Sequence, residues 1–279
     1  MPEKTFSLRN IDLSALTFGN PEGYPVLCLH GWLDNAASFQ PLAPFLEEFQ
    51  LLALDLPGHG HSGHRSLGAH YHLLDNITDL HELVELLGWE EFYILGHSLG
   101  GILGSIYAAC FPEKVKKLVA IEAFGGLTEE PKSSAEQLRK SVISRLSRAE
   151  KATRHPSSVD TAVAARIMAG KMHESSARLL MQRNIQDHQG TLRWRTDPRL
   201  RTVSPLRLTE PQANAFIESI QCPWLTLLGD KGFEKLKINL QRRKHSVQQF
   251  HYAECEGGHH VHMDNPEPVA CAVRDFLHA

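Results

Sequence analysis

Short apolar runs alternate with segments of helical periodicity in the first part of the chain. An initial hairpin is expected from TFSLR and IDLSALTFG. Four later runs are typical of buried strands and end in Gly, His, Asp or Glu: residues 25–31, 51–58, 92–98 and 117–124. Helical spacing of apolar residues is found in the segments between them: residues 38–48, residues 70–88 and the stretch that starts at Ser98. This alternation predicts an α/β fold with a mostly parallel, doubly wound sheet.

The alternation stops at Leu127. From there to about Gln212 the sequence is helical in character, with Arg-rich stretches such as AEQLRKSVISRLSRAE. It contains no run typical of a buried strand. We therefore expect residues 127–212 to form an inserted helical lid.

Strand patterns return after this segment, at residues 222–230 and 247–254, and Pro266 opens a closing helix. The core is therefore predicted to consist of two stretches, residues 1–126 and 213–279. A chain of 279 residues is long for one domain and short for two, which favours one core with an inserted subdomain.

Composition and charge argue against several classes of protein. A net charge of -3 gives no support for nucleic-acid binding. No apolar run approaches the roughly 20 residues of a membrane helix, and MPEKTFSLRN lacks the features of a signal peptide. The five cysteines are odd in number and widely spread, which is typical of reduced thiols. We expect a cytoplasmic protein that acts on a small molecule, with no membrane span and no nucleic-acid partner.

The stretch FYILGHSLGGILGSIYAA, residues 92–109, contains a G-x-S-x-G sequence between a predicted strand and a predicted helix. Gly96 and Gly100 would relieve crowding where the strand turns into the helix, leaving the hydroxyl of Ser98 exposed above the sheet. A serine hydroxyl is a poor nucleophile at neutral pH and needs a neighbouring base. Ser98 is the predicted nucleophile, and a second residue must supply that base.

Four motifs fall at strand ends in the order His30-Gly31-Trp32, DLPGHGHS, GHSLG and Gly258-His259. With these motifs and the stretches LCLHGWLDNAASF and GGHHVHMDNPE, the chain resembles the α/β-hydrolase family over nearly its full length. It looks most like the serine-hydrolase-like (kraken-like) branch. The resemblance implies the α/β-hydrolase fold, a catalytic triad and no cofactor.

The resemblance also assigns the catalytic base. In the family pattern the base directly follows a Gly and stands seven residues before the Pro that opens the last helix, and His259 meets both conditions with Pro266. Histidine suits this role because its ordinary pKa of about 6.5 lets it accept and return a proton. His260 and His262 are interpreted as loop or pocket-wall residues.

Two backbone N–H groups are expected to form an oxyanion hole. One belongs to Leu99, the residue after the nucleophile. The resemblance places the other on Trp32, directly after His30-Gly31. The indole of Trp32 is also a candidate for lining the pocket.

The third member of the triad departs from the common pattern. The family's acid lies three residues beyond a Gly that ends the strand after the lid, and here Gly232 occupies that place. Asp230 comes two residues too early. The strand before the lid ends in Glu122, where the branch favours a carboxylate, and a charged residue in that place needs a partner. Glu122 is the preferred acid, Asp230 is the alternative, and a site without an orienting acid is a third option.

Two other enzyme classes fit less well. His59, His61 and His64 nearly match the H-x-H-x-D-H of metallo-β-lactamase-like hydrolases, but Gly63 stands where the aspartate is required. We therefore expect no metal site. Dehalogenases and epoxide hydrolases use a nucleophilic aspartate at the place of Ser98, so their reactions are disfavoured.

The predicted lid is basic. It holds 12 Arg and 4 Lys against 9 acidic residues, a net charge of +7, whereas the remainder carries -10. Solvated helix faces packed on an acidic body would explain this asymmetry, and a positive rim that attracts anionic substrates is the sharper interpretation.

We expect a serine hydrolase that cleaves the ester of a small or medium acyl group through an acyl-enzyme. One alternative is a hydrolase of carbon–carbon bonds in a dicarbonyl acid, which would use the same triad. The other is a ligand receptor that keeps the hydrolase pocket and has incidental turnover.

Overall fold

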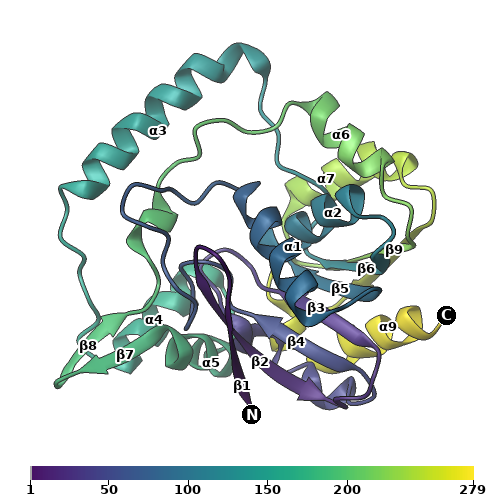
Figure 1. The fold of residues 1–279 in the computed structure, drawn as a ribbon, viewed down its shortest axis with the longest axis horizontal. Helices are drawn as coiled ribbons and strands as arrows, with labels where there is room; N and C mark the ends of the chain where they lie inside the picture. The colour runs from purple at the N-terminus through teal and green to yellow at the C-terminus, as the bar shows by residue number, and fades with distance from the viewer. Residues whose placement is uncertain (1) are drawn as a thin grey trace.

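Eight strands join into one sheet in the order β1-β2-β4-β3-β5-β6-β9-β10 in the computed structural model, which describes residues 2–279 (Figure 1). The strands are β1 (Glu3–Ser7), β2 (Asp12–Gly19), β3 (Pro25–Leu29), β4 (Gln50–Leu54), β5 (Phe92–His97), β6 (Val115–Ile121), β9 (Trp224–Gly229) and β10 (Phe250–Cys255). β1 and β2 pair antiparallel, β2 pairs antiparallel with β4, and all other pairs are parallel. The predicted α/β class and mostly parallel sheet are confirmed.

Both faces of the sheet are covered, and a separate cluster of buried apolar side chains lies against each. Along β3, Leu27 and Leu29 belong to one cluster, whereas Val26 and Cys28 belong to the other. This alternation follows from the two-residue period of a strand and explains the continuous apolar runs in the sequence. The covering helices are α1 (Asp75–Leu87), α2 (Leu99–Cys110), α7 (Glu234–Arg243) and α9 (Pro266–His278), with the short α8 (Val261–Asp264) and η5 (Lys244–Ser246).

The helix predicted over residues 38–48 does not form. The segment holds two short 3₁₀ turns, η1 (Ala36–Phe39) and η2 (Ala43–Phe45). Pro41 and Pro44 fall within it, and proline lacks the N–H that a helix interior requires. The spacing of apolar residues in this segment therefore reflects burial against the sheet and not a helix.

The segment between β6 and β9 is mainly helical, and in Figure 1 its first long helix, α3, stands apart from the sheet. Its elements are η3 (Pro131–Ser133), α3 (Ser134–Ala149), α4 (Val159–Gly170), α5 (Glu174–Asn184), β7 (Ile185–His188), β8 (Thr191–Trp194), η4 (Pro198–Arg201) and α6 (Glu210–Glu218). Residue 212, the predicted end of the lid, lies within α6, which contacts α2 of the core. In the described part of the chain, no helix has the length and apolar character needed to cross a bilayer.

The hairpin of β7 and β8 was not predicted from the sequence. Its two strands pair antiparallel and are joined by Gln189 and Gly190. Both residues have positive φ angles, 54° and 80°, as a type I′ turn requires. The strands are short and carry no clear alternation of apolar residues, so the sequence gives only the glycine as a signal.

A buried ion pair holds α5 against the sheet. Arg183 donates from Nε and Nη2 to Asp55 Oδ2 at 2.9 and 2.6 Å, and from Nη2 to Glu3 Oε1 at 2.7 Å. Asp55 follows β4, is completely buried, and also accepts the backbone N–H groups of Ala36 at 2.7 Å and His61 at 2.8 Å. One guanidinium thus joins α5 to the strand ends on which the neighbouring loops are built.

We expect Arg183→Met to lower the free energy of unfolding by about 3–5 kcal/mol, because it leaves the Asp55 carboxylate buried without its counter-charge. Arg178→Met is the matched control on the same helix, since Arg178 pairs with Asp160 and Glu174 at the exposed surface. Urea unfolding of both variants gives the comparison. Equal shifts of the two midpoints would contradict a structural role for the buried pair.

Candidate functional site

Ser98 lies at the sharp turn between β5 and α2. Its φ of 50° and ψ of −114° fall in a sparsely populated region, and its backbone N–H donates to the carbonyl of Ile121 at 2.9 Å. A Cβ added at Gly96 would lie 2.5 Å from the backbone of Gly100, and one at Gly100 would overlap the carbonyl of Leu29. The glycines of the G-x-S-x-G sequence thus permit the close approach of strand and helix, as predicted for a nucleophile elbow.

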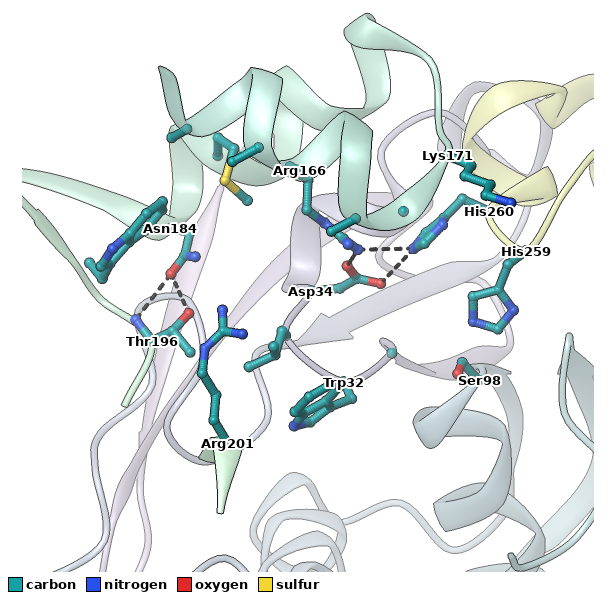
Figure 2. A pocket seen from close by; sticks show the side chains of 18 of the residues that line it. Trp32, Asp34, Ser98, Arg166, Lys171, Asn184, Thr196, Arg201, His259 and His260 are labelled. Atoms are coloured by element: carbon teal, nitrogen blue, oxygen red, sulfur yellow. Dashed lines mark hydrogen bonds and ion pairs between the residues drawn. The ribbon is translucent and has the colours of Figure 1, made fainter. Parts of the chain in front are cut away.

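Glu122 and His259 meet across the carboxyl edge of the sheet. Glu122 directly follows β6, is buried and has a φ of 51°, and His259 lies in the loop after β10. Nδ1 of His259 lies 3.0 Å from Oε2 of Glu122, while Oε1 accepts the backbone N–H of Gly229 at 2.8 Å. Because a carboxylate only accepts, Nδ1 carries the proton, and in the neutral form of the ring Nε2 has the lone pair. Figure 2 shows His259 beside Ser98 at one end of the pocket that both residues line.

Asp230, the alternative acid, lies in a different environment. Its Oδ1 accepts the backbone N–H of Gly257 at 2.7 Å, and this hydrogen bond lowers the pKa of its exposed carboxyl. Gly232, at the family's usual acid position, lies directly against Glu122, and a Cβ there would overlap the carboxylate. Glu122 therefore contacts His259, whereas Asp230 binds the backbone of the loop that precedes His259.

The two predicted oxyanion-hole donors are both free to bind a ligand. Leu99 is the first residue of α2, where a backbone N–H has no partner within the helix. Trp32 lies in the loop after β3 and lines the pocket. Within residues 2–279, neither of these N–H groups donates a hydrogen bond to the protein. The indole of Trp32 donates from Nε1 to the carbonyl of Leu200 at 3.0 Å, which joins this loop to η4.

The pocket beside Ser98 has a volume of about 1310 Å³ (Figure 2). Its floor is formed by the strand ends, and α4, α5 and η4 contribute the opposite walls. Apolar side chains from several elements line it: Ala162, Ala165, Ala169, Met181, Trp194 and Phe233. A cavity of this size can enclose a small-molecule ligand.

A buried network around Asp34 was missed in the sequence. The carboxylate pairs through Oδ1 with Arg166 of α4, and its Oδ2 lies 3.3 Å from His260 Nε2 and 3.6 Å from His97 Nδ1. Burial alone would raise the pKa of Asp34, but the adjacent guanidinium of Arg166 holds it well below its usual value. The only sequence signals were the positions of Asp34 after HGWL and of His97 inside GHSLG.

His97 positions the backbone of the candidate base. Its Nε2–H donates to the carbonyl of His259 at 2.9 Å. Burial, with a contribution from His262 and His259, lowers the pKa of His97 well below its usual value, so the ring is neutral at pH 7. His260 lines the pocket, whereas His262 lies in α8, completely buried, 2.7 Å from Ser38 Oγ. The interpretation of His262 as a loop or pocket-wall residue was therefore wrong.

The histidines of the metal alternative do not converge. His59 is buried and accepts the N–H of Leu33 at 3.2 Å, His61 pairs with Glu3 at 2.8 Å, and His64 contacts a backbone carbonyl at 2.7 Å. Each ring thus has a separate partner, and the three do not form a shared ligand set.

Across the described chain, the group with metal-like spacing is Asp34, His97 and His260. The guanidinium of Arg166 already occupies the Asp34 carboxylate and lies 3.1 Å from His260 Nε2. A cation in that place would have to displace another cation, so we describe the group as an ion-pair network.

Comparison with known proteins identifies a family that covers most of the chain. The family described as alpha/beta hydrolase fold matches residues 24–266. Human serine hydrolase-like protein 2 is 32% identical, with 95% of this chain and 90% of that protein aligned. A probable serine hydrolase of Drosophila melanogaster is also 32% identical, over 95% of this chain and 84% of that protein.

Solved structures agree with this placement. A hypothetical protein of Pseudomonas aeruginosa is 38% identical, with a TM-score of 0.92 over 99% of this chain and 97% of that one. The thioesterase domain of the curacin biosynthetic pathway is 27% identical, with a TM-score of 0.86 over 99% of both chains. The chain therefore belongs to the α/β-hydrolase fold family and, within it, to the serine hydrolase-like proteins.

Proposed function

We propose that this hydrolase cleaves the ester of a small or medium acyl group through an acyl-enzyme, with Ser98 as nucleophile, His259 as base and Glu122 as orienting acid. The observation that carries the proposal is the hydrogen bond between His259 Nδ1 and Glu122, next to a serine at a strained turn. That bond fixes the tautomer in which Nε2 can accept a proton. The free N–H groups of Trp32 and Leu99 supply the matching donors for an oxyanion.

In the acylation step, His259 Nε2 takes the hydroxyl proton as Ser98 Oγ attacks the carbonyl carbon. The carbonyl electron pair moves to oxygen, and the Trp32 and Leu99 N–H groups stabilise the resulting oxyanion. Glu122 stabilises the imidazolium that forms on His259. The intermediate collapses, the bond to the leaving oxygen breaks, and His259 returns the proton to the departing alcohol.

Deacylation repeats the same chemistry with water. His259 Nε2 takes a proton from water as its oxygen attacks the acyl carbon bound to Ser98 Oγ. Collapse of the second oxyanion breaks the bond to Ser98, which recovers its proton from His259. The products are a carboxylic acid and an alcohol. A thioester would follow the same steps, and the name of the curacin thioesterase domain supports including thioesters among the substrates tested.

We also propose that residues 127–212 act as a cap, since α4, α5 and η4 supply walls of the pocket over Ser98. Cytoplasmic location stays a prediction from the sequence. So do the two alternative functions, carbon–carbon bond cleavage and ligand reception. Steady-state turnover of an acyl p-nitrophenyl ester series separates an esterase from a receptor, which would bind tightly and turn over slowly.

Ser98→Ala should abolish both fluorophosphonate labelling and ester turnover in a protein that stays folded, because the hydroxyl supplies the reacting atom. Ser105→Ala is the control on the same helix, where the hydroxyl bonds only to the carbonyl of Ile102. Intact-mass spectrometry and a p-nitrophenyl ester assay give the result. Undiminished hydrolysis by Ser98→Ala would overturn the proposal, and loss of that activity with a chelator would favour metal chemistry instead.

His259→Ala should lower kcat by about 10³-fold or more, because loss of the base disables the whole triad. His260→Ala should be much milder, since that ring contacts Asp34 and Arg166 rather than the reacting serine. Both are measured as kcat on the folded fraction. If His260→Ala were the inactive variant, the assignment of the base would be off by one residue.

Glu122→Gln should lower kcat by roughly 10²- to 10⁴-fold with little change in KM, because the amide keeps the shape but loses the charge and favours the wrong tautomer of His259. Asp230→Asn should cost less than about tenfold, since this side chain bonds to Gly257 and not to the imidazole. Steady-state kinetics on the folded variants decide between the two acids. A crippled Asp230→Asn beside a mild Glu122→Gln would transfer the role to Asp230.

A further inference from the structure

The pocket beside Ser98 is strongly cationic. Seven of its lining residues are lysines or arginines and one is acidic, Asp34; the cationic residues are Arg148, Lys151, Arg154, Arg166, Lys171, Arg201 and Lys231. Most of these side chains belong to the segment between β6 and β9. Part of the positive charge of this segment therefore faces the pocket, and the rest lies on the solvated faces of the segment.

Several of these charges are already engaged. Arg166 is paired with Asp34, Lys231 lies 3.7 Å from Glu256, and Arg148 donates to the carbonyl of Lys151 at 2.7 Å. The single carboxylate of the pocket is thus neutralised by its own arginine. The remaining cations have no acidic group in the pocket to balance them.

Arg201 is the best placed of the unbalanced cations. It ends η4, and its guanidinium makes no hydrogen bond or ion pair with any residue that the structure describes. Figure 2 shows its side chain directed into the pocket, with Trp32 between it and Ser98. Arg201 is exposed at the pocket mouth, and partial burial with the neighbouring charges of Arg166 and Arg148 lowers its pKa below the usual value. A guanidinium in this position gains from a bound anion.

The segment that carries Arg201 is held in place relative to the reacting centre. Trp32 Nε1 donates to the carbonyl of Leu200, and Trp32 also supplies one of the free backbone donors. On the other side, Asn184 Oδ1 accepts the backbone N–H of Thr196 at 3.0 Å, so this acceptor is satisfied within the protein. The guanidinium of Arg201 therefore lies on an anchored part of the wall and is free to bind a ligand.

We infer that the substrate carries an oxyanionic group, of which a carboxylate is the simplest, on the part that extends from Ser98 past Trp32, and that Arg201 binds this group. The planar fork of a guanidinium matches the two oxygens of a carboxylate. This inference rests on the proposed ester hydrolysis and adds the substrate class. It distinguishes a site for acyl esters with a second, charged end from one for simple aliphatic esters.

The test compares mono-p-nitrophenyl adipate with its methyl ester, which has the same chain without the charge. The unmodified enzyme should prefer the anionic ester in kcat/KM, and Arg201→Gln should lower that preference by about 10- to 100-fold. Arg201→Lys should restore part of it. Arg139→Gln is the control, because Arg139 is exposed on α3, lies outside the pocket and carries the same charge. It should leave the preference unchanged.

A second readout does not depend on turnover. Adipate binding, measured by titration calorimetry, should weaken at least tenfold in Arg201→Gln and stay the same in Arg139→Gln. Equal kcat/KM for the two esters, or equal effects of the two Arg variants, would overturn the anion site and leave the proposed esterase intact. Failure of both esters together with unlabelled Ser98 would instead overturn the proposed function, while adipate binding would still decide the role of Arg201.

Discussion

The carboxylate of Glu122 is buried at the end of β6, and a buried charge has to be met by hydrogen-bond donors. It finds them in the backbone N–H of Gly229, which ends the neighbouring strand, and in Nδ1 of His259. The first bond ties the acid to the sheet, and the second orients the imidazole. Gly232 leaves the space that the carboxylate fills, since a side chain there would overlap it. The family's usual acid position thus holds a glycine, and the Glu122 carboxylate occupies the space that a side chain there would need.

A second buried carboxylate, that of Asp34, connects the surrounding loops to one another. Asp34 lies in the loop that carries Trp32; it pairs with Arg166 of α4 and lies 3.3 Å from His260, the neighbour of the candidate base. His97 adds a hydrogen bond to the backbone of His259. The loop after β3, the loop that holds His259 and a wall of the pocket therefore meet in one electrostatic network.

The parts of this arrangement that depend on local sequence could be predicted, and those that depend on tertiary contacts could not. The strands could be predicted from apolar runs. The turn at Ser98 could be predicted from the glycines that allow the strand and the helix to approach each other closely. The choice between Glu122 and Asp230 stayed open because it depends on which carboxylate reaches His259 in space. Asp34 and Arg166 are separated by 132 positions, so no spacing rule connects them. In residues 38–48 a local signal was misread. The apolar residues have helical spacing, but Pro41 and Pro44 prevent a helix from forming.

The basic character of residues 127–212 has two physical origins, which the structure separates. Arg183 and Arg166 are counter-ions for Asp55 and Asp34, two carboxylates that the core buries completely or nearly so, and these arginines stabilise the attachment of the segment. Each guanidinium is engaged by a carboxylate of the protein, so neither is left unpaired for a substrate. Arg201 has no such partner among residues 2–279, and it faces the pocket beside two further arginines. Net charge alone would count all three alike, whereas their pairing assigns the first two to the fold and leaves the third for a ligand.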